Sequence, residues 1–202
     1  MARRSGSVVT RRIAAPDRRA KRTRVRIERS LLELLAERGY ERTSVRDVSA
    51  RAAVGKSTFY EHFRDKDAVL ESRLARLARV LGRATAGAEL AFPFLEPLLD
   101  HVSLHRSLAS RLGKSSAGVL VLTRFTRVVR ASVRAELERL YPEAPAQTLD
   151  FATEHVTGGL TALLEARSAQ ACSRKAAEAA LDFRRLVLPG LDAWLGSVRP
   201  RS

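Results

Sequence analysis

Apolar residues recur along most of the chain at the three- and four-residue spacing of one helix face. The first stripe lies in a helix predicted to begin at about Ala20 and to end before Gly39, where a left-handed residue commonly closes a helix. The members of this stripe are Ile27, Leu31, Leu34 and Leu35. Because all four fall on one face, the helix is predicted to pack against other elements.

A second and a third short helix follow. Ser44 is a natural N-cap, and Asp47, three residues later, completes a variant of the capping box. Residues 53–55 are predicted to turn the chain before a third helix that begins at Lys56. In that helix only Phe59 and Phe63, spaced i and i+4, are suited to burial, so the other side chains are expected to face outward.

The rest of the sequence is also helical in pattern. Asp65 is predicted to start a fourth helix with a long apolar stripe formed by Leu70, Leu74, Leu77 and Leu81. Further helices are predicted over residues 98–112, 119–141, about 147–168 and 175–196. No segment shows a convincing two-residue alternation, so the predicted fold class is all-α.

A helix, a short turn and a second helix make up the helix-turn-helix unit, whose second helix enters the major groove of DNA. Such a helix keeps one edge in the core and offers hydrogen-bonding groups elsewhere, which is the composition of KSTFYEH at residues 56–62. Lys56 is suited to donate to guanine, and Ser57 and Thr58 to bases or phosphates. The predicted backbone contacts are Tyr60, His62 and, at the start of the fourth helix, Lys66.

Much of the net positive charge of the chain lies in its N-terminal residues. The 202-residue chain has a formal net charge of +15, and residues 1–29 hold eleven Lys and Arg against two acidic residues. Residues 1–19 lack helical periodicity and are predicted to be a basic, flexible arm. The arm is either a solubilising tail or an additional contact to phosphates or the minor groove, and a polyanionic partner is expected in the second case.

The segment TSVRDVSARAAVGKSTFYEHFRDKDAVL resembles the DNA-binding segment of the tetracycline-repressor (TetR) family of transcriptional regulators. The resemblance is specific over about residues 22–70, with TFYEHF followed by Lys66 as its most telling part. It implies a homodimer with two DNA-binding heads, a divergent helical effector domain, and dimerisation through the last two long helices. The positions that it implies for DNA binding are Ser44, Arg46, Lys56, Ser57, Thr58, Tyr60, His62 and Lys66.

Two positions depart from the family pattern. Ala53 stands where the turn glycine is expected, and Gly55 stands where a capping side chain is usual. Gly55 permits the turn but supplies no side-chain cap to the third helix. With the resemblance, the predicted organisation is an arm at 1–19, a DNA-binding head at 20–66, and an effector-binding and dimerisation domain at 67–202.

Candidate ligand-binding residues lie in the larger part. His101 and His105 are spaced i and i+4, as in some metal pairs, but no third ligand is evident, and pocket-lining or surface histidines are the favoured alternative. Phe94 and Phe125 are predicted either to line an effector pocket or to pack in the core. Gly158 and Gly159 favour close approach of another helix, or space for a ligand.

The sequence predicts neither an enzyme nor a bound cofactor or metal, since no phosphate loop, nucleophile elbow or clustered carboxylate pair is present. Cys172 is the only cysteine, which excludes an intrachain disulfide and a Cys-rich zinc site. No apolar run resembles a signal peptide or a membrane span, so a cytoplasmic protein is expected.

The predicted function is therefore a repressor that a small-molecule effector releases from double-stranded operator DNA. The alternative is a basic architectural protein that binds nucleic acid without sequence preference.

Overall fold

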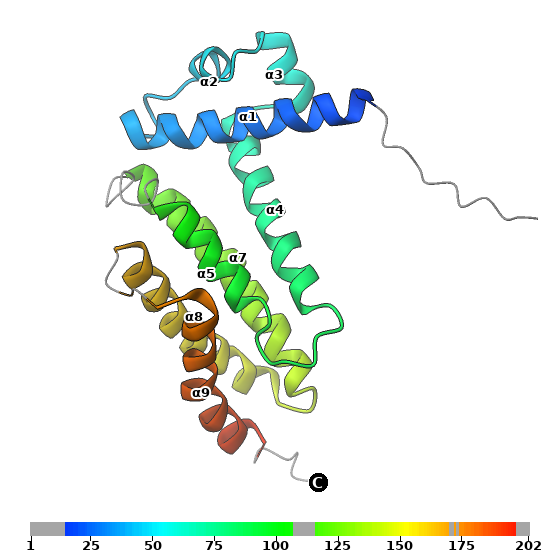
Figure 1. Ribbon diagram of the computed structural model, residues 1–202, viewed down its shortest axis with the longest axis vertical. Helices are drawn as coiled ribbons and strands as arrows, with labels where there is room; N and C mark the ends of the chain where they lie inside the picture. The colour runs from blue at the N-terminus through cyan, green and yellow to red at the C-terminus, as the bar shows by residue number, and fades with distance from the viewer. Residues whose placement is uncertain (1–14, 107–115, 170–171, 173, 197–202) are drawn as a thin grey trace, which may run out of the picture.

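The computed structural model describes residues 15–106, 116–169, 172 and 174–196, which form eight helices and no strand. The predicted all-α fold is thereby confirmed. In Figure 1 two short helices lie on one side of α1, and the larger group of helices lies on the other. A long helix, α4, runs from the first group to the second.

The smaller group is called the head here and consists of α1, α2, α3 and residues 66–74 of α4. Their bounds are α1 Ala15–Arg38, α2 Val45–Arg51, α3 Lys56–His62 and α4 Lys66–Thr85. A buried cluster joins them, and its side chains of lowest exposure include Ile27, Leu31, Val48, Phe59 and Val69. The predicted apolar stripe of the first helix and the predicted anchoring of the third helix by Phe59 and Phe63 are both confirmed.

The larger group is called the body and consists of the remainder of α4 with α5, α7, α8 and α9. Their bounds are α5 Leu95–Leu104, α7 Ser116–Leu140, α8 Ala146–Ser168 and α9 Ala176–Leu195. Its core includes Phe92, Leu98, Val133, Leu137 and Leu160, all fully buried. Leu108 and Leu112, which were predicted to extend the fifth helix, lie outside the described residues.

α4 contributes to both hydrophobic clusters. Leu70 and Leu74 belong to the head cluster, and Leu77 and Leu81 belong to the body cluster. Each buried leucine stabilises the fold by about 1.5–3 kcal/mol relative to an exposed one. Phe125 and Val128 of α7 pack against both clusters. The apolar packing is therefore continuous from head to body, along one side of α4.

The first helix begins earlier than predicted, at Ala15 instead of Ala20. Pro16 is compatible with this start, because the N–H groups of the first helical turn have no partner within the helix in any case. Residues 15–19 of the predicted arm are thus helical, and residues 1–14 lie outside the described part of the chain.

Two buried charged residues hold the segment that leads from α4 into α5. Glu136 of α7 is fully buried and accepts a hydrogen bond of 2.7 Å from the backbone N–H of Phe92. Arg184 of α9 donates to the backbone oxygens of Ala91 and Phe92. Phe92 itself has a φ of 49°, a left-handed conformation that needs such support. These contacts fix the start of α5, which carries His101.

None of the helices in the described ranges combines the length and the apolarity that a membrane span requires.

Candidate nucleic-acid interface and ligand cavity

A capping box fixes the start of α2, as the sequence predicted. The side chain of Ser44 accepts a hydrogen bond from the Asp47 N–H, and Asp47 Oδ2 accepts from the Ser44 N–H at 2.9 Å. Arg38 of α1 reaches Oδ1 of the same carboxylate at 3.1 Å. The hydrogen bonds from the Ser44 side chain and backbone lower the pKa of Asp47 to about 2, with Arg38 adding to the effect. Asp47 therefore stays ionised and links α2 to α1 at neutral pH.

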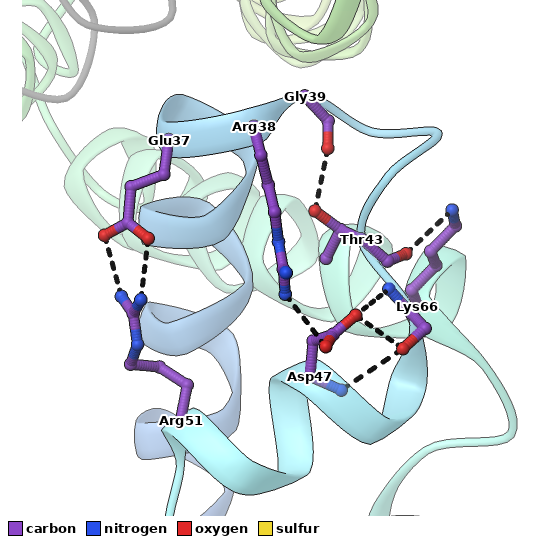
Figure 2. Close-up of polar contacts among 8 residues, drawn as sticks. Glu37, Arg38, Gly39, Thr43, Asp47, Arg51 and Lys66 are labelled. Atoms are coloured by element: carbon purple, nitrogen blue, oxygen red, sulfur yellow. Dashed lines mark hydrogen bonds and ion pairs between the residues drawn. The ribbon is translucent and has the colours of Figure 1, made fainter.

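A second ion pair joins the far end of α2 to α1. Arg51 donates from Nη1 and Nη2 to the two carboxylate oxygens of Glu37, at 2.8 and 2.6 Å. This is the two-pronged geometry that a guanidinium and a carboxylate adopt when both are oriented. Figure 2 shows the two pairs side by side, with Arg38 on Asp47 and Arg51 on Glu37. Both ends of α2 are thus fixed on α1.

Lys66 is used inside the head. Its Nζ donates to the backbone oxygens of Tyr40 and Thr43, at 2.9 and 3.1 Å, and lies 3.8 Å from the centre of the Tyr40 ring. Figure 2 shows the ammonium directed at Thr43, whose hydroxyl in turn donates to the Gly39 oxygen. The α1–α2 loop is therefore held by Lys66. The phosphate contact that the sequence predicts for Lys66 stays a prediction, and these carbonyls compete with it.

The turn between α2 and α3 contains an unusual residue. Ala53 has a φ of 49°, so the position predicted to prefer glycine does adopt the left-handed conformation. The turn is closed by hydrogen bonds from Ala53 N–H to the Ala50 oxygen and from Val54 N–H to the Ser49 oxygen. Gly55 is the N-cap of α3 and, as predicted, provides no side-chain hydrogen bond.

The outward side of α3 carries the predicted DNA-binding groups. Phe59 is fully buried on the inward side, with Tyr60 packed edge-on against its ring. Lys56, Ser57 and Tyr60 are exposed, whereas Thr58 and His62 are half-buried. Arg46 of α2 and its N-cap Ser44 are exposed. Seven of the eight predicted residues therefore lie on α3 or at the start of α2, and Lys66 is the first residue of α4.

The first half of α1 adds positive charge beside α3. Its basic side chains are exposed, and Arg24 lies over the Phe63 ring, 4.6 Å from the ring centre. The exposed set is Arg18, Arg19, Lys21, Arg22, Arg24, Arg26 and Arg29. Part of the predicted basic arm is thus a charged helix with a fixed position relative to α3.

Comparison with known proteins is consistent with this head. Residues 29–72 match the family model described as bacterial regulatory proteins, tetR family. The head of this chain is therefore similar to the DNA-binding segment of TetR-family regulators. The matched range runs from the second half of α1 into α4 and includes every residue predicted for DNA contact.

Individual proteins are similar to this chain over different lengths. An uncharacterised helix-turn-helix transcriptional regulator of Bacillus subtilis, YxbF, is 31% identical over 61 residues, which is 30% of this chain and 16% of that protein. A TetR transcriptional regulator from Streptococcus agalactiae has a TM-score of 0.53 and 24% identity, over 85% of this chain and 97% of that one. A TetR-like regulator from Rhodococcus sp. RHA1 gives 0.57 and 18%, over 84% and 95%. The structural matches show that the fold extends through the body.

The body contains an open cavity of about 200 Å³ between α4 and α5. α4 contributes Arg73, Arg76, Leu77 and Val80 to its lining. From the α5 side come Pro97, His101 and His105, the last being the C-cap of the helix. Two of the four predicted pocket residues therefore line this cavity. Phe94 is fully buried in the body core, and Phe125 lies between the two hydrophobic clusters.

The two histidines are held in a neutral form. His105 Nδ1 lies 2.8 Å from the His101 backbone oxygen and must donate to it, so Nε2 accepts from Arg73 Nη2 at 2.6 Å. Burial lowers the pKa of His101 to about 4, and His105, Arg73 and Arg76 act in the same direction. Burial also lowers the pKa of His105. Among the described residues no group of three His, Cys, Asp or Glu is arranged to hold a metal.

Sequence reasoning missed the arginines of this cavity and their acidic neighbour on α1. Glu28 is 2% exposed, and its Oε2 lies 2.7 Å from Arg76 Nη2. A signal for Glu28 was available, because it stands three residues before Leu31 on the buried face of an otherwise basic helix. For Arg73 and Arg76 no such signal exists, since arginines are frequent throughout the chain.

The left-handed Ala53 leads to a stability prediction. A left-handed conformation costs a non-glycine residue about 1–2 kcal/mol, and glycine gives back part of this through its more flexible unfolded state. Ala53→Gly should therefore raise the stability of the protein by about 0–1 kcal/mol in urea unfolding followed by circular dichroism. The matched control, Ala50→Gly within α2, should lower stability by about 1 kcal/mol. Equal losses in both variants would contradict the left-handed turn.

His101 should titrate far below the ordinary histidine range. Since its pKa is about 4 when folded and near 6.5 in an unfolded chain, the unfolded state binds more protons between these values. The contribution of His101 to stability is therefore lost as pH falls from about 6.5 towards 4. Histidine ring signals in NMR spectra, assigned with His101→Gln, should show His101 still neutral at pH 5. A midpoint near 6.5 would contradict its burial.

Proposed function

We propose that the protein is a transcriptional repressor that binds operator DNA sequence-specifically as a homodimer and is released by a small-molecule effector. The observation that carries the proposal is the side of α3 that bears exposed Lys56, Ser57 and Tyr60, on a helix held by buried Phe59. A helix of this kind can enter the major groove with its N-terminal residues towards the base edges. The match of residues 29–72 to the TetR family model supports the same assignment.

Roles within the head follow from exposure and reach. Lys56 is the first residue of α3 and is suited to donate to guanine O6 or N7. Ser44, Arg46, Ser57, Thr58, Tyr60 and His62 would contact phosphates or base edges nearby. The exposed arginines of α1 would add sequence-independent affinity through counterion release. Lys66 would act first by holding the α1–α2 loop, with any phosphate contact in addition.

The proposed homodimer uses the outward faces of α8 and α9. Phe151 is 66% exposed and packs edge-on against Trp194 of α9, with ring centres 5.4 Å apart. Gly158 and Gly159 on α8 are exposed, and beyond the neighbouring backbone of α8 nothing lies within 4 Å of a Cβ added at either. Large aromatics beside small residues allow a second helix pair to approach closely. Leu191 of α9, by contrast, is buried in the body core.

Repression then depends on the spacing of two heads. Half-sites on DNA lie about 34–36 Å apart, and a symmetric dimer must present its two α3 helices at that distance. An effector that binds more tightly to a body with a different head spacing would shift the population away from the DNA-competent state.

The alternative function is a basic architectural protein without sequence preference, which the net charge of +15 favours. Selection of bound duplexes from a random library separates the two functions. A repressor should enrich a palindromic sequence, and an architectural protein should enrich none.

Lys56→Ala should then alter base preference. Removing a bidentate contact to guanine should reduce discrimination at one base pair of each half-site by about 1–3 kcal/mol. The matched control is Lys21→Ala on α1, which removes the same charge and should weaken selected and random DNA by similar factors. Fluorescence anisotropy with single-base variants of the selected duplex measures both. If Lys56→Ala binds with unchanged base preference, α3 does not read the operator through this residue.

Phe151→Glu should disrupt the dimer. A charge at the centre of an apolar interface would be buried without a partner, which strongly opposes association. Sedimentation velocity at micromolar concentration should show dimers of the unmodified protein and monomers of the variant. Val25→Glu, at an exposed apolar residue of α1 in the head, should remain dimeric. Dimers in both variants would rule out this face.

A further inference from the structure

The cavity between α4 and α5 combines an apolar wall with a concentration of positive charge. Leu77, Val80 and Pro97 supply the wall, and Arg73 and Arg76 lie beside them. At about 200 Å³ the cavity is smaller than the roughly 300–1,000 Å³ of sites for drug-sized molecules. It is therefore suited to a small ligand.

Arg73 lacks an acidic partner among the described residues. Among the described residues its hydrogen-bond partner is neutral His105, which uses a single N–H of the five that a guanidinium carries. Burial lowers the pKa of Arg73, as expected for a cation removed from water. A partly buried cation with spare donors is stabilised by any anion that reaches it.

Glu28 is the acidic group closest to this pair of arginines, and its charge is already shared. Its Oε2 pairs with Arg76 at 2.7 Å, and its Oε1 accepts a hydrogen bond from Ser72 at 3.0 Å. The ion pair is not aligned as a hydrogen bond, because Oε2 has no such partner among the described residues. Among the described residues, one carboxylate therefore faces two guanidinium groups, an excess of one positive charge at the cavity.

We propose that this cavity binds a small organic monocarboxylate, with the carboxylate on Arg73 and Arg76 and the apolar part against Leu77, Val80 and Pro97. The proposal rests on the proposed function in that it names the chemical class of the effector. His105 holds the Arg73 guanidinium at the cavity. Because both histidines are neutral, the charge that would bind the carboxylate comes from Arg73 and Arg76.

The same contact would link the ligand to the head. Arg76 belongs to α4 and lines the cavity, whereas its partner Glu28 belongs to α1 of the head. A ligand carboxylate on Arg76 competes with Glu28 for the guanidinium. Binding would therefore weaken the ion pair between Glu28 of α1 and Arg76 of α4, and by reciprocity a firm α1–α4 contact would weaken binding.

Hexanoate, acetate and hexanamide are suitable probes for isothermal titration calorimetry of the full-length protein without DNA. Hexanoate carries both the charge and the apolar chain, acetate lacks the chain, and hexanamide lacks the charge. Hexanoate should bind with a millimolar or lower dissociation constant, at least tenfold more tightly than either of the others.

Arg73→Gln should weaken hexanoate binding at least tenfold, whereas Arg79→Gln, at an exposed arginine of the same helix, should leave it unchanged. Circular dichroism establishes that both variants are folded. Arg73→Lys keeps the charge and should retain part of the preference for hexanoate over hexanamide, so the test does not depend on one variant.

Glu28→Gln tests the link to the head. Since this change removes the competing charge with little change in shape, hexanoate should bind the variant at least threefold more tightly than the unmodified protein. An unchanged affinity would overturn the link.

The class of ligand is overturned if hexanamide or acetate binds as well as hexanoate, or if none of the three binds at 10 mM. It is also overturned if Arg73→Gln and Arg79→Gln bind hexanoate with equal affinity. Because these measurements contain no DNA, such a failure is distinct from failure of the proposed function, which would appear as the absence of a selected operator sequence.

Discussion

The packing of α4 into two hydrophobic clusters fixes the position of the head on the body. Leu70 and Leu74 lie in one cluster and Leu77 and Leu81 in the other, all on one face of a single helix. From Leu70 to Leu81 the helix rises about 16 Å, and an α-helix transmits displacement over that length with little bending. A shift of α4 in the body therefore moves the head as well. The cavity lies against this helix, at the turns where it leaves the head.

The short helix α3 depends on neighbouring elements for its stability. With seven residues and no side-chain cap it is too short to be stable alone, because isolated helices below about 12–15 residues are marginal in water. Its order therefore comes from buried Phe59 and Phe63 and from α2, which Asp47 and Arg51 fix on α1. Because these contacts inside the head position α3, the side chains on its outer side are not needed to hold the fold. Lys66, just beyond α3, is one of the residues that stabilise the head, through its hydrogen bonds to the α1–α2 loop.

The sequence was sufficient for the parts of this structure that depend on local pattern. The apolar stripes and the capping box at Ser44 follow from spacing within a few residues, and the special position of Ala53 follows from the resemblance to the TetR family. The start of α1 was misplaced by five residues, because a polar helix turn has no apolar period to mark it. The cavity was identified only through its histidines. Arg73, Arg76 and Glu28 meet across 45 to 48 residues of sequence, and no local pattern reports such a contact.

The ion pair between Glu28 and Arg76 is difficult to explain by stability alone. Removing a carboxylate from water costs several kcal/mol, and well-packed apolar residues at such a site are often equally or more stabilising. An apolar contact between α1 and α4 would, however, be insensitive to charge at the cavity. An ion pair holds the two helices in one arrangement while Arg76 is paired with Glu28, and it weakens when a competing anion binds Arg76. Its presence at the boundary of head and body is therefore better explained by response to a ligand than by its contribution to folding.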